Sequence, residues 1–516
     1  MSRLIGLLSL VLLLTPAAAI RGQSTAVDPV MMARIRDEGL QHSRVMDFES
    51  YMTDVLGARL TASDDMRRAQ QWVQREMTSL GLTNVIAEPF MDWGVSWDNE
   101  YVTLQLLEPD YTPMVGYPIA YTPGTDGKQV AEVVIVDLQT RADLDRYRGT
   151  LKRRIVLSTP PAPIDLGPLT NGVQRWTDSA LARIAASVIV VPRTPRTTGP
   201  RNPELLTAAE KLAFYQSEGV IAVLECQSGW LGAVRGYARP GAAADHWSRE
   251  GVLASPVVVA VTPEHYNRMY RLVQRHIPVK VELEVRNRIG DRVQPAVNIT
   301  AEIPGTDLKD QVVMIGAHFD TWHASPNASD NTSGVAVALE AMRILWAVGA
   351  KPRRTIRVAL WSGEEQGLIG SRAYVRKHFG DPHNATTGTT PAYNTLSAYF
   401  NQDYGAGQYR GIYLQGNEAA RPMMTAWMAP FRDFGMTLVS TQMLYQTDHV
   451  SFDEAGLPGF QFLQDRLPAE GGHTNLDFFD TIQGDDMMKN AVVMAAFAYD
   501  AAMSDSMVPR KPIHHE

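Results

Sequence analysis

The pattern of hydrophobic and polar positions changes three times along the chain. Residues 30–82 have helical spacing, and the helix expected over Arg67–Leu82 follows a possible N-cap at Ser63 or Asp64 and stops near Gly81. Residues 99–122 then alternate apolar and polar side chains, as in YVTLQLLE, which predicts a strand. The N-terminal part is therefore expected to combine helices with at least one strand.

From about 128 to 290 the chain becomes rich in short β-like runs. Between these runs lie loops rich in Pro and Gly, such as PRTPRTTGPRNPE and RGYARPGAAAD. The runs are VAEVVIVD, RRIVLST, AASVIVVP, GVIAVLE and PVVVAV. This texture predicts a separate small α/β domain placed inside another domain.

From about 296 onward, strands and helices alternate. Four strand-length apolar runs appear, and the helix between the first two has its larger apolar residues on one face. The runs are QVVMIGA, TIRVALW, LSAYFN and GFQFLQ, and the predicted helices are SGVAVALEAMRILWAVG and GLIGSRAYVRKH. Such alternation predicts an α/β fold with a mostly parallel central sheet flanked by helices, in which ligands bind beyond the carboxyl ends of the strands.

Residues able to bind a metal cluster after these strands. They are His318 and Asp320 in MIGAHFDTW, Asp330 in NASDNTSG, Glu364 and Glu365 in WSGEEQG, Asp403 in FNQDYG, and His473 in GGHTNLD. Most of them directly follow a predicted strand, so they should meet at one edge of the sheet. Two histidines and three carboxylates suit a pair of zinc ions, and one further carboxylate remains as a base. The inventory indicates two-metal hydrolysis.

These motifs, in this order, resemble the MH-clan di-zinc exopeptidases, the group of aminopeptidase Y, leucyl aminopeptidase and carboxypeptidase Q. The resemblance extends to GARLTAS at 57–63 and to the segment 128–290, which resembles a protease-associated domain. One motif, FNQDYG, departs from the Asn-Leu-Asp spelling common in the family. The resemblance implies a zinc exopeptidase fold with an inserted small β-rich domain, two zinc ions per chain and peptide substrates.

Carried over residue by residue, the resemblance implies distinct roles within the site. His318 and Asp403 would bind one zinc ion, Glu365 and His473 the other, and Asp330 would bridge both. Glu364 would be the general base that takes a proton from water and returns it to the leaving amine. Asp320 would lie behind the imidazole of His318 and fix its tautomer. Zinc suits these ligands, although cobalt or manganese could replace it.

The end of the peptide that is cut stays open at this point. The acidic surroundings of Glu364, Asp330 and Asp403 favour a free α-amine, and hence an aminopeptidase. A carboxypeptidase or dipeptidase of the carboxypeptidase Q type would need a cation for the terminal carboxylate. The candidates for that cation are Arg372, Arg410 and Arg466. A single-zinc glutaminyl cyclase and a non-catalytic homologue are the remaining alternatives. The chain has no GxSxG, HExxH, Walker A or CxxC motif.

Several other residues have weaker functional interpretations. His449 and Tyr445, in YQTDHVSF, are as consistent with packing as with a role in the pocket, where Tyr445 could donate to an oxyanion. His323 is a candidate for the pocket lining, and His514 and His515 belong to a tail expected to be disordered.

Length and composition add the context. A chain of 516 residues suggests two or more domains, and its net charge of −8 without a basic stripe argues against nucleic acid as a partner. Arg3, an apolar run and the small residues Ala17–Ala19 resemble a cleaved signal, and the single cysteine excludes an internal disulfide. An exported, periplasmic or extracellular enzyme, with no membrane association after cleavage, is expected. The predicted divisions are a signal peptide (1–23), the first catalytic segment (24–127), the insertion (128–290), the main catalytic segment (291–505) and a tail (506–516).

Overall fold

The computed structural model describes most of the chain. The described residues are 27–164, 175–186, 202–226, 230–239, 247–384, 386, 388–467 and 471–511. The expected signal peptide, most of the predicted strand AASVIVVP and both histidines of the tail lie outside these ranges. Within them, no helix combines the length and apolar character that crossing a bilayer requires.

Within the described residues, one sheet of fourteen strands connects both parts of the molecule. Seven neighbouring strands, in the order β13-β12-β14-β11-β9-β10-β8, form its catalytic half, and four of their six pairings are parallel. Their bounds are β8 Lys280–Ile303, β9 Leu308–His318, β10 Arg354–Trp361, β11 Leu396–Asn401, β12 Tyr409–Tyr413, β13 Leu438–Ser440 and β14 Gly459–Gln464. The predicted α/β class, with a mostly parallel central sheet between helices, is confirmed.

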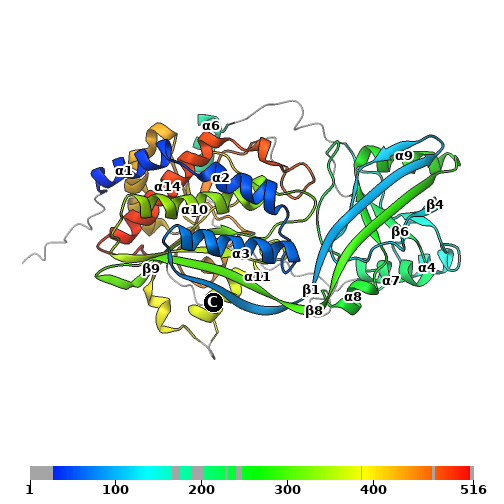
Figure 1. Ribbon diagram of the computed structural model, residues 1–516, viewed down its shortest axis with the longest axis horizontal. Coiled ribbons are helices and arrows are strands. Elements are labelled where there is room, and N and C mark those ends of the chain that lie inside the picture. The colour runs from blue at the N-terminus through cyan, green and yellow to red at the C-terminus, as the bar shows by residue number, and fades with distance from the viewer. Residues whose placement is uncertain are drawn as a thin grey trace, which may run out of the picture.

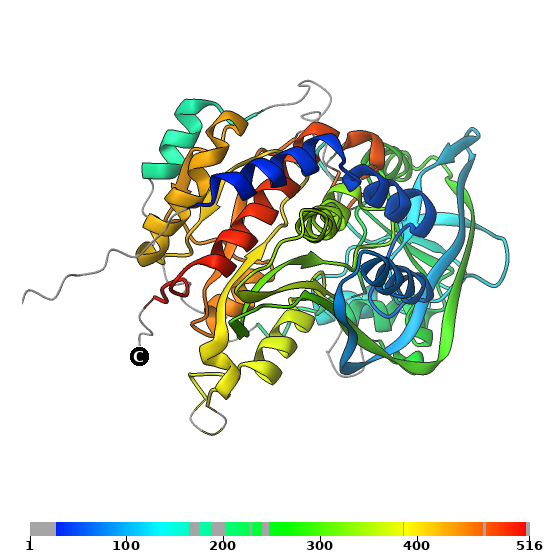
Figure 2. The ribbon, with the colours of Figure 1, turned by 60° about the vertical axis from the view of Figure 1, so that its left-hand side comes forward.

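Helices cover both faces of this half, as Figure 2 shows. One face packs against α10 and α14, with α1, α2 and α3 outside or beside them, and the other face packs against α11 and α13. The bounds are α1 Pro29–Gln41, α2 Val45–Ser50, α3 Asp64–Ser79, α10 Ser333–Ala347, α11 Ile369–His378, α12 Arg421–Met428, α13 His449–Glu454 and α14 Gly484–Met503. Short helical turns are η1 Tyr51–Leu56, η2 Ala328–Thr332, η3 Pro391–Thr395, η4 Glu418–Ala420, η5 Ala429–Phe434 and η6 Phe479–Thr481.

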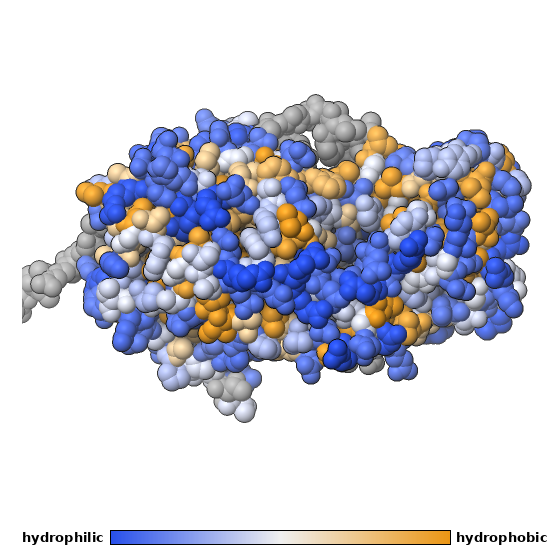
Figure 3. Space-filling view, in the orientation of Figure 1, coloured by the Kyte–Doolittle hydropathy of each residue, from blue (hydrophilic) through white to orange (hydrophobic). Residues whose placement is uncertain are grey.

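Helix α10 differs from its prediction in one respect. The sequence pattern gives it a single apolar face, yet nearly every residue from Ser333 to Leu345 is buried. The reason is that α1, α2 and α14 pack over the side that faces away from the sheet. Such all-round burial fixes the N-terminal end of α10, which follows directly on Asp330. Helix α3 instead begins as predicted, with Ser63 accepting a hydrogen bond from Met66 N, and exposes Arg67, Arg68 and Arg75. Figure 3 shows a hydrophilic band across the region where Figure 1 places α3.

Two long strands connect the catalytic half to a second part of the molecule. Strand β1, Thr83–Glu108, pairs antiparallel with β8 along almost its whole length, with several bulges that bend the pair. Figure 1 shows these strands passing from the helical half into the smaller half. The elements there are β2 Thr112–Met114, β3 Gly116–Pro118, β4 Gln129–Ile135, α4 Arg141–Tyr147, β5 Ile155–Leu157, α7 Ala208–Glu218, β6 Ala222–Glu225, α8 Arg249–Leu253, β7 Val258–Val261 and α9 Pro263–Gln274.

The second part has its own apolar core, which includes Leu104 and Met114 as well as residues of the predicted insertion. The division of the chain at 128 and 290 stays a prediction. Strands β4, β5, β6 and β7 correspond to four of the five predicted runs. In the fifth, AASVIVVP, the two alanines that the structure describes end helix α6, Asp178–Ala186.

Helix α6 lies on the catalytic half, although its sequence belongs to the predicted insertion (Figure 1). Leu181 packs with Leu438 of β13 and Leu463 of β14. Just before the helix, Arg175 forms ion pairs with Asp465 at 3.1 Å and with Asp486 at 2.9 Å. Both carboxylates are buried, so the guanidinium offsets charge that would otherwise be costly to bury.

Replacing Arg175 with Met should therefore destabilise the fold. The expected loss is about 1–2 kcal/mol, below the ~3–5 kcal/mol of a fully buried pair, because solvent reaches this guanidinium and Arg410 also pairs with Asp465. Chemical denaturation measures the change. The matched control is Arg183→Met on the exposed side of α6, which should leave the midpoint unchanged. Equal stability of the two variants would contradict the assigned role of Arg175.

Candidate metal centre

Three neighbouring strands deliver most of the predicted site residues to one edge of the sheet. His318 is the last residue of β9, and its register partner on the parallel strand β10 is Trp361. Glu364 and Glu365 follow in the turn after β10, and Asp403 lies two residues beyond the end of β11. Because parallel strands end at the same edge, these side chains converge.

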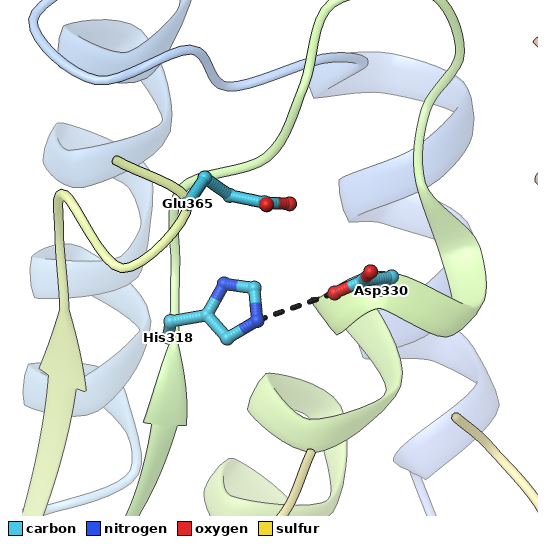
Figure 4. Close-up of side chains that lie close together, drawn as sticks. All are labelled: His318, Asp330 and Glu365. Atoms are coloured by element: carbon cyan, nitrogen blue, oxygen red, sulfur yellow. Dashed lines mark ion pairs between the residues drawn. The ribbon is translucent and has the colours of Figure 1, made fainter. Parts of the chain in front are cut away.

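Asp330 lies between two histidines. One of its carboxylate oxygens, Oδ1, is 3.3 Å from Nε2 of His318, and the other, Oδ2, is 2.9 Å from Nε2 of His473. Figure 4 shows His318 pointing at Asp330 from the strand, with Glu365 extending into the same space. A carboxylate with one oxygen facing each histidine has the geometry needed to bridge two cations.

The remaining carboxylates divide between the two histidines. Asp403 Oδ1 is 3.6 Å and Glu364 Oε2 is 4.0 Å from Nε2 of His318. Glu365 Oε2 is 2.9 Å from Nε2 of His473. All six predicted residues, the departing motif FNQDYG included, thus come together in one cluster.

Asp320 is arranged differently from its expected position. Nδ1 of His318 contacts the main-chain oxygen of Asp320 at 2.9 Å, whereas the carboxylate oxygen lies 3.9 Å away. The carboxylate instead accepts hydrogen bonds from the main-chain N–H groups of Glu364 and Glu365 and from the hydroxyl of Thr61. The tautomer of His318 is therefore set by a carbonyl, and the Asp320 side chain holds the turn that carries both glutamates.

Two supporting residues were not singled out from the sequence. Asp477, four residues after His473, accepts hydrogen bonds from Ser329 N at 2.8 Å and from Asp330 N at 3.2 Å. The buried Arg59 donates from Nε to Phe319 O and from a terminal nitrogen to Thr332 Oγ1, so it joins the loop after β9 to the start of α10. Both residues lie inside quoted motifs, GARLTAS and GGHTNLD, but only the fold reveals their partners.

Burial and mutual repulsion strongly perturb the acidic groups. Burial, followed by the nearby carboxylates of Asp403 and Asp448, raises the pKa of Glu364 well above its usual range, although His318 lowers it. Burial also raises the pKa of Glu365 to about 7. For Asp330, burial opposes ionisation, but the two histidines outweigh it and hold the pKa below its usual range.

The histidines respond in the opposite sense. Burial lowers the pKa of His473, but Glu365 and Asp330 more than compensate and raise it to about 11. The same competition, with Glu364 and Asp403 as the main partners, raises the pKa of His318. Without a metal the cluster thus holds protons in place of cations.

Two groups of these residues could hold metal ions. Ligand atoms of His318, Asp330 and Glu365 lie within 4.8 Å of one another, and so do those of His318, Glu364 and Asp403. The second oxygen of Glu365, Oε1, is buried and accepts no hydrogen bond from the described residues. A set of imidazoles and carboxylates with an orphaned buried oxygen fits zinc.

A cavity of about 970 Å³ opens over this cluster. Tyr445 lines it, as expected for a pocket residue. His449 is fully buried outside the lining, and His323 hydrogen bonds to Pro118 O at 2.6 Å, also outside it. The interpretation of His323 as a pocket residue was wrong, because its ring packs edge-on against Trp97 in the core between the two halves.

The second part of the molecule reaches the cavity through one short segment. Gly236 N donates to His473 O at 2.8 Å, and Asn475 N donates to Val234 O at 3.0 Å. Between them, the guanidinium of Arg235 lies 3.2 Å from Nδ1 of His473. The loop that carries His473 is therefore held by residues from outside the catalytic half.

Comparison with known proteins identifies relatives of this chain. Residues 298–498, which contain every site residue, match the model of peptidase family M28. The match places the catalytic segment of the chain with this family. Carboxypeptidase Q of Bos taurus is 25% identical over 488 residues, which cover 92% of this chain and 88% of the relative. The family match and the named relatives support a metallopeptidase of the exopeptidase class.

Solved structures share the fold. A peptidase M28 precursor from Shewanella amazonensis has a TM-score of 0.65 at 22% identity and covers 94% of this chain and 99% of its own. A zinc aminopeptidase from Bacillus subtilis has a TM-score of 0.56 at 18% identity, with 89% of this chain and 94% of its own covered. At these identities the likeness extends to the architecture alone.

Replacing Asp477 with Asn should weaken metal binding without abolishing the fold. The amide presents a donor toward one of the two main-chain N–H groups that the carboxylate now accepts, so the turn before α10 shifts and Asp330 with it. We expect zinc affinity to fall by about 10–100-fold, which competition with a chelating dye measures. The exposed Asp480→Asn is the matched control. Unchanged affinity in Asp477→Asn would refute the positioning role.

Proposed function

We propose that this chain is an exported di-zinc exopeptidase that releases a single residue from the carboxyl end of a short peptide. His318 and Asp403 would hold one zinc ion, Glu365 and His473 the other, and Asp330 would lie between them. Two such ions would lower the pKa of a water molecule and polarise the scissile carbonyl. The fit of the donor set, and in particular the two-sided contacts of Asp330, supports this assignment.

The chain's own groups would carry the proton transfers. Glu364 is close to His318 but makes no contact with His473, so it is the carboxylate best placed to face the water. In hydrolysis the carbon–nitrogen bond breaks, a hydroxyl joins the acyl carbon and a proton joins the amine. Glu364 would take that proton from the water and deliver it to the leaving nitrogen. The carboxylate of Asp320 would keep Glu364 in place through its main-chain N–H.

The charge of the cavity decides which end of the peptide we favour. Four ionised carboxylates, those of Asp330, Glu364, Glu365 and Asp403, would be balanced by two divalent cations. Their attraction for a substrate amine, on which the expectation of an aminopeptidase rested, is then largely cancelled.

What remains around the cavity is basic. Among the described residues, Arg235, Arg372 and Arg466 line it, together with the outer carboxylate of Glu454. Of the three arginines suggested by the sequence, Arg410 instead pairs with Asp465 and is not part of the lining. A cavity with a surplus of guanidinium groups favours a substrate carboxylate. The nearly full-length similarity to carboxypeptidase Q points the same way.

Two blocked substrates test the proposed specificity directly. An N-acetylated dipeptide has a free carboxylate and no amine, whereas an aminoacyl anilide has a free amine and no carboxylate. We expect the zinc-loaded enzyme to hydrolyse the acetylated dipeptide and to leave the anilide nearly intact. Hydrolysis of the anilide alone would identify an aminopeptidase and overturn this specificity. Hydrolysis of neither, with zinc bound, would favour a single-zinc cyclase or a non-catalytic homologue.

Replacing Glu364 with Gln should reduce kcat by about 10²–10⁴-fold, because the amide cannot accept the proton of the water. Zinc content, measured by elemental analysis, should stay at the wild-type value. The control is Glu418→Gln, an exposed glutamate on η4 outside the cavity lining. Near-normal turnover by Glu364→Gln would show that another group is the base, and loss of zinc would show that Glu364 is a ligand.

A further inference from the structure

In the segment 232–236 the main chain is held in place, whereas the guanidinium of Arg235 is exposed to the cavity. Val234 and Gly236 are buried, and four hydrogen bonds join the main chain of the segment to the His473 loop. One of them runs from Val234 N to Asn475 Oδ1 at 2.5 Å. Arg235 forms an isolated antiparallel bridge with Thr474. Its Cα is therefore held in place, while its side chain is exposed to the cavity.

The guanidinium of Arg235 has no carboxylate partner among the described residues. It lies 3.2 Å from Nδ1 of His473. The other two arginines of the cavity are different. Arg372 lies 3.3 Å from Glu454 and also donates to Gly367 O, and Arg466 lies over the ring of Tyr404 at 5.8 Å. Arg235 is thus the guanidinium of the cavity that lies directly against the metal cluster.

His473 offers Arg235 no acceptor once its Nε2 binds a metal. A histidine that binds zinc through Nε2 carries its ring proton on Nδ1 and cannot accept a hydrogen bond there. The arginine then has five donors, a fixed main chain and no acceptor on His473. A bidentate carboxylate is the ligand that fits such a fork.

We propose that Arg235 binds the terminal carboxylate of the substrate, so that the second part of the molecule supplies the group that selects carboxyl ends. The inference rests on the proposed function and deepens it. A guanidinium one imidazole ring away from a ligand nitrogen can reach a carboxylate one residue beyond the scissile bond, since consecutive Cα atoms are ~3.8 Å apart. It cannot serve a long leaving peptide equally well. The leaving group is therefore a single amino acid.

The test compares Arg235→Gln and Arg235→Lys with the wild-type enzyme. For an N-acetylated dipeptide, Arg235→Gln should raise KM by roughly 10–100-fold with kcat within a few-fold. Hydrolysis of the matching C-terminal amide should not change, and Arg235→Lys should restore part of the loss. The control is Arg271→Gln on α9, an exposed arginine outside the cavity lining. Zinc content should be equal in all four proteins.

A second readout does not depend on turnover. Calorimetry with an N-acetylated amino acid, a product that carries the carboxylate alone, is performed on zinc-loaded Glu364→Gln with and without Arg235→Gln. We expect binding to weaken by the same factor as KM. Equal losses on the acid and amide substrates, or loss of zinc, would show that Arg235 only holds His473 in place. An unchanged KM would also overturn the inference.

The two measurements separate this inference from the proposed function. If the wild-type enzyme cleaves only aminoacyl anilides, the proposed specificity fails. A carboxylate site at Arg235 would still appear as Arg235-dependent binding of the acetylated amino acid. If the enzyme cleaves the acetylated dipeptide and Arg235→Gln has no effect, the proposed function stands, and the carboxylate is bound elsewhere, with Arg466 the next candidate.

Discussion

The carboxylate of Asp330, placed between two histidines from distant parts of the chain, is the contact on which the site depends. His318 ends a strand in the middle of the sheet, and His473 lies in a loop more than a hundred residues later. Both approach Asp330 within 3.3 Å, one at each oxygen. Buried carboxylates that surround these histidines repel one another, and only positive charge keeps them together. The histidines supply part of it when protonated, and the proposed metal ions would supply the rest.

The surrounding structure serves to keep Asp330 where it is. Helix α10 starts just after it and is buried on all sides, so its end cannot move without disturbing the core. Asp477 accepts the two N–H groups of the preceding turn, and Arg59 joins that turn to the loop after β9. Each of these groups is itself buried and charged, which is costly unless its partners stay in place. The rigidity of the site is thus built from pairs that tolerate no loss of either member.

Much of this arrangement could be predicted from the sequence, for a physical reason. Residues such as His318 and Asp403 directly follow apolar strands, and parallel strands end at one edge, so local pattern alone brings these side chains together. The Asp320 carboxylate could not be assigned in the same way. Its sequence position suggests a contact with His318, but the chain turns, and the main-chain oxygen takes that place.

Contacts across long sequence distances were likewise not predictable. Asp477 and Arg59 both occur in recognisable motifs, but their partners are far away in the sequence. Asp477 accepts from Asp330, 147 residues away, and Arg59 donates to Thr332, 273 residues away. The helical conformation of α6 was harder to predict, because its last alanines precede a run of valines that has strand character. Its packing against β13 and β14, together with the ion pairs of Arg175, shows that this stretch lies on the catalytic half, apart from the segments next to it in the sequence.

The two long strands β1 and β8 explain how a separate unit can influence catalysis. They run from the catalytic sheet into the second part, which is therefore fused to the site's own scaffold. From that part, the segment 232–236 returns to the His473 loop, and α6 crosses to the β13 edge, beside the strand that leads to Arg466. Trp176 donates hydrogen bonds to Gln464 O and to the carboxylate of Asp465, the residue that precedes Arg466. The second part thus contacts the cavity at Arg235 and supports the strand end that precedes Arg466.

In the proposed function, the catalytic sheet and the second part of the molecule have different roles. The catalytic sheet gathers acidic groups that two cations would neutralise, so the metal centre itself has little preference for either end of a peptide. In the proposed function, selectivity comes from charges that the metals would leave uncompensated, and the arginines of the cavity are the candidates. One of them, Arg235, is carried by the second part, and another, Arg466, follows the strand end that α6 covers. Changes in the insertion would therefore alter which peptide end is bound while the residues that activate water stay as they are.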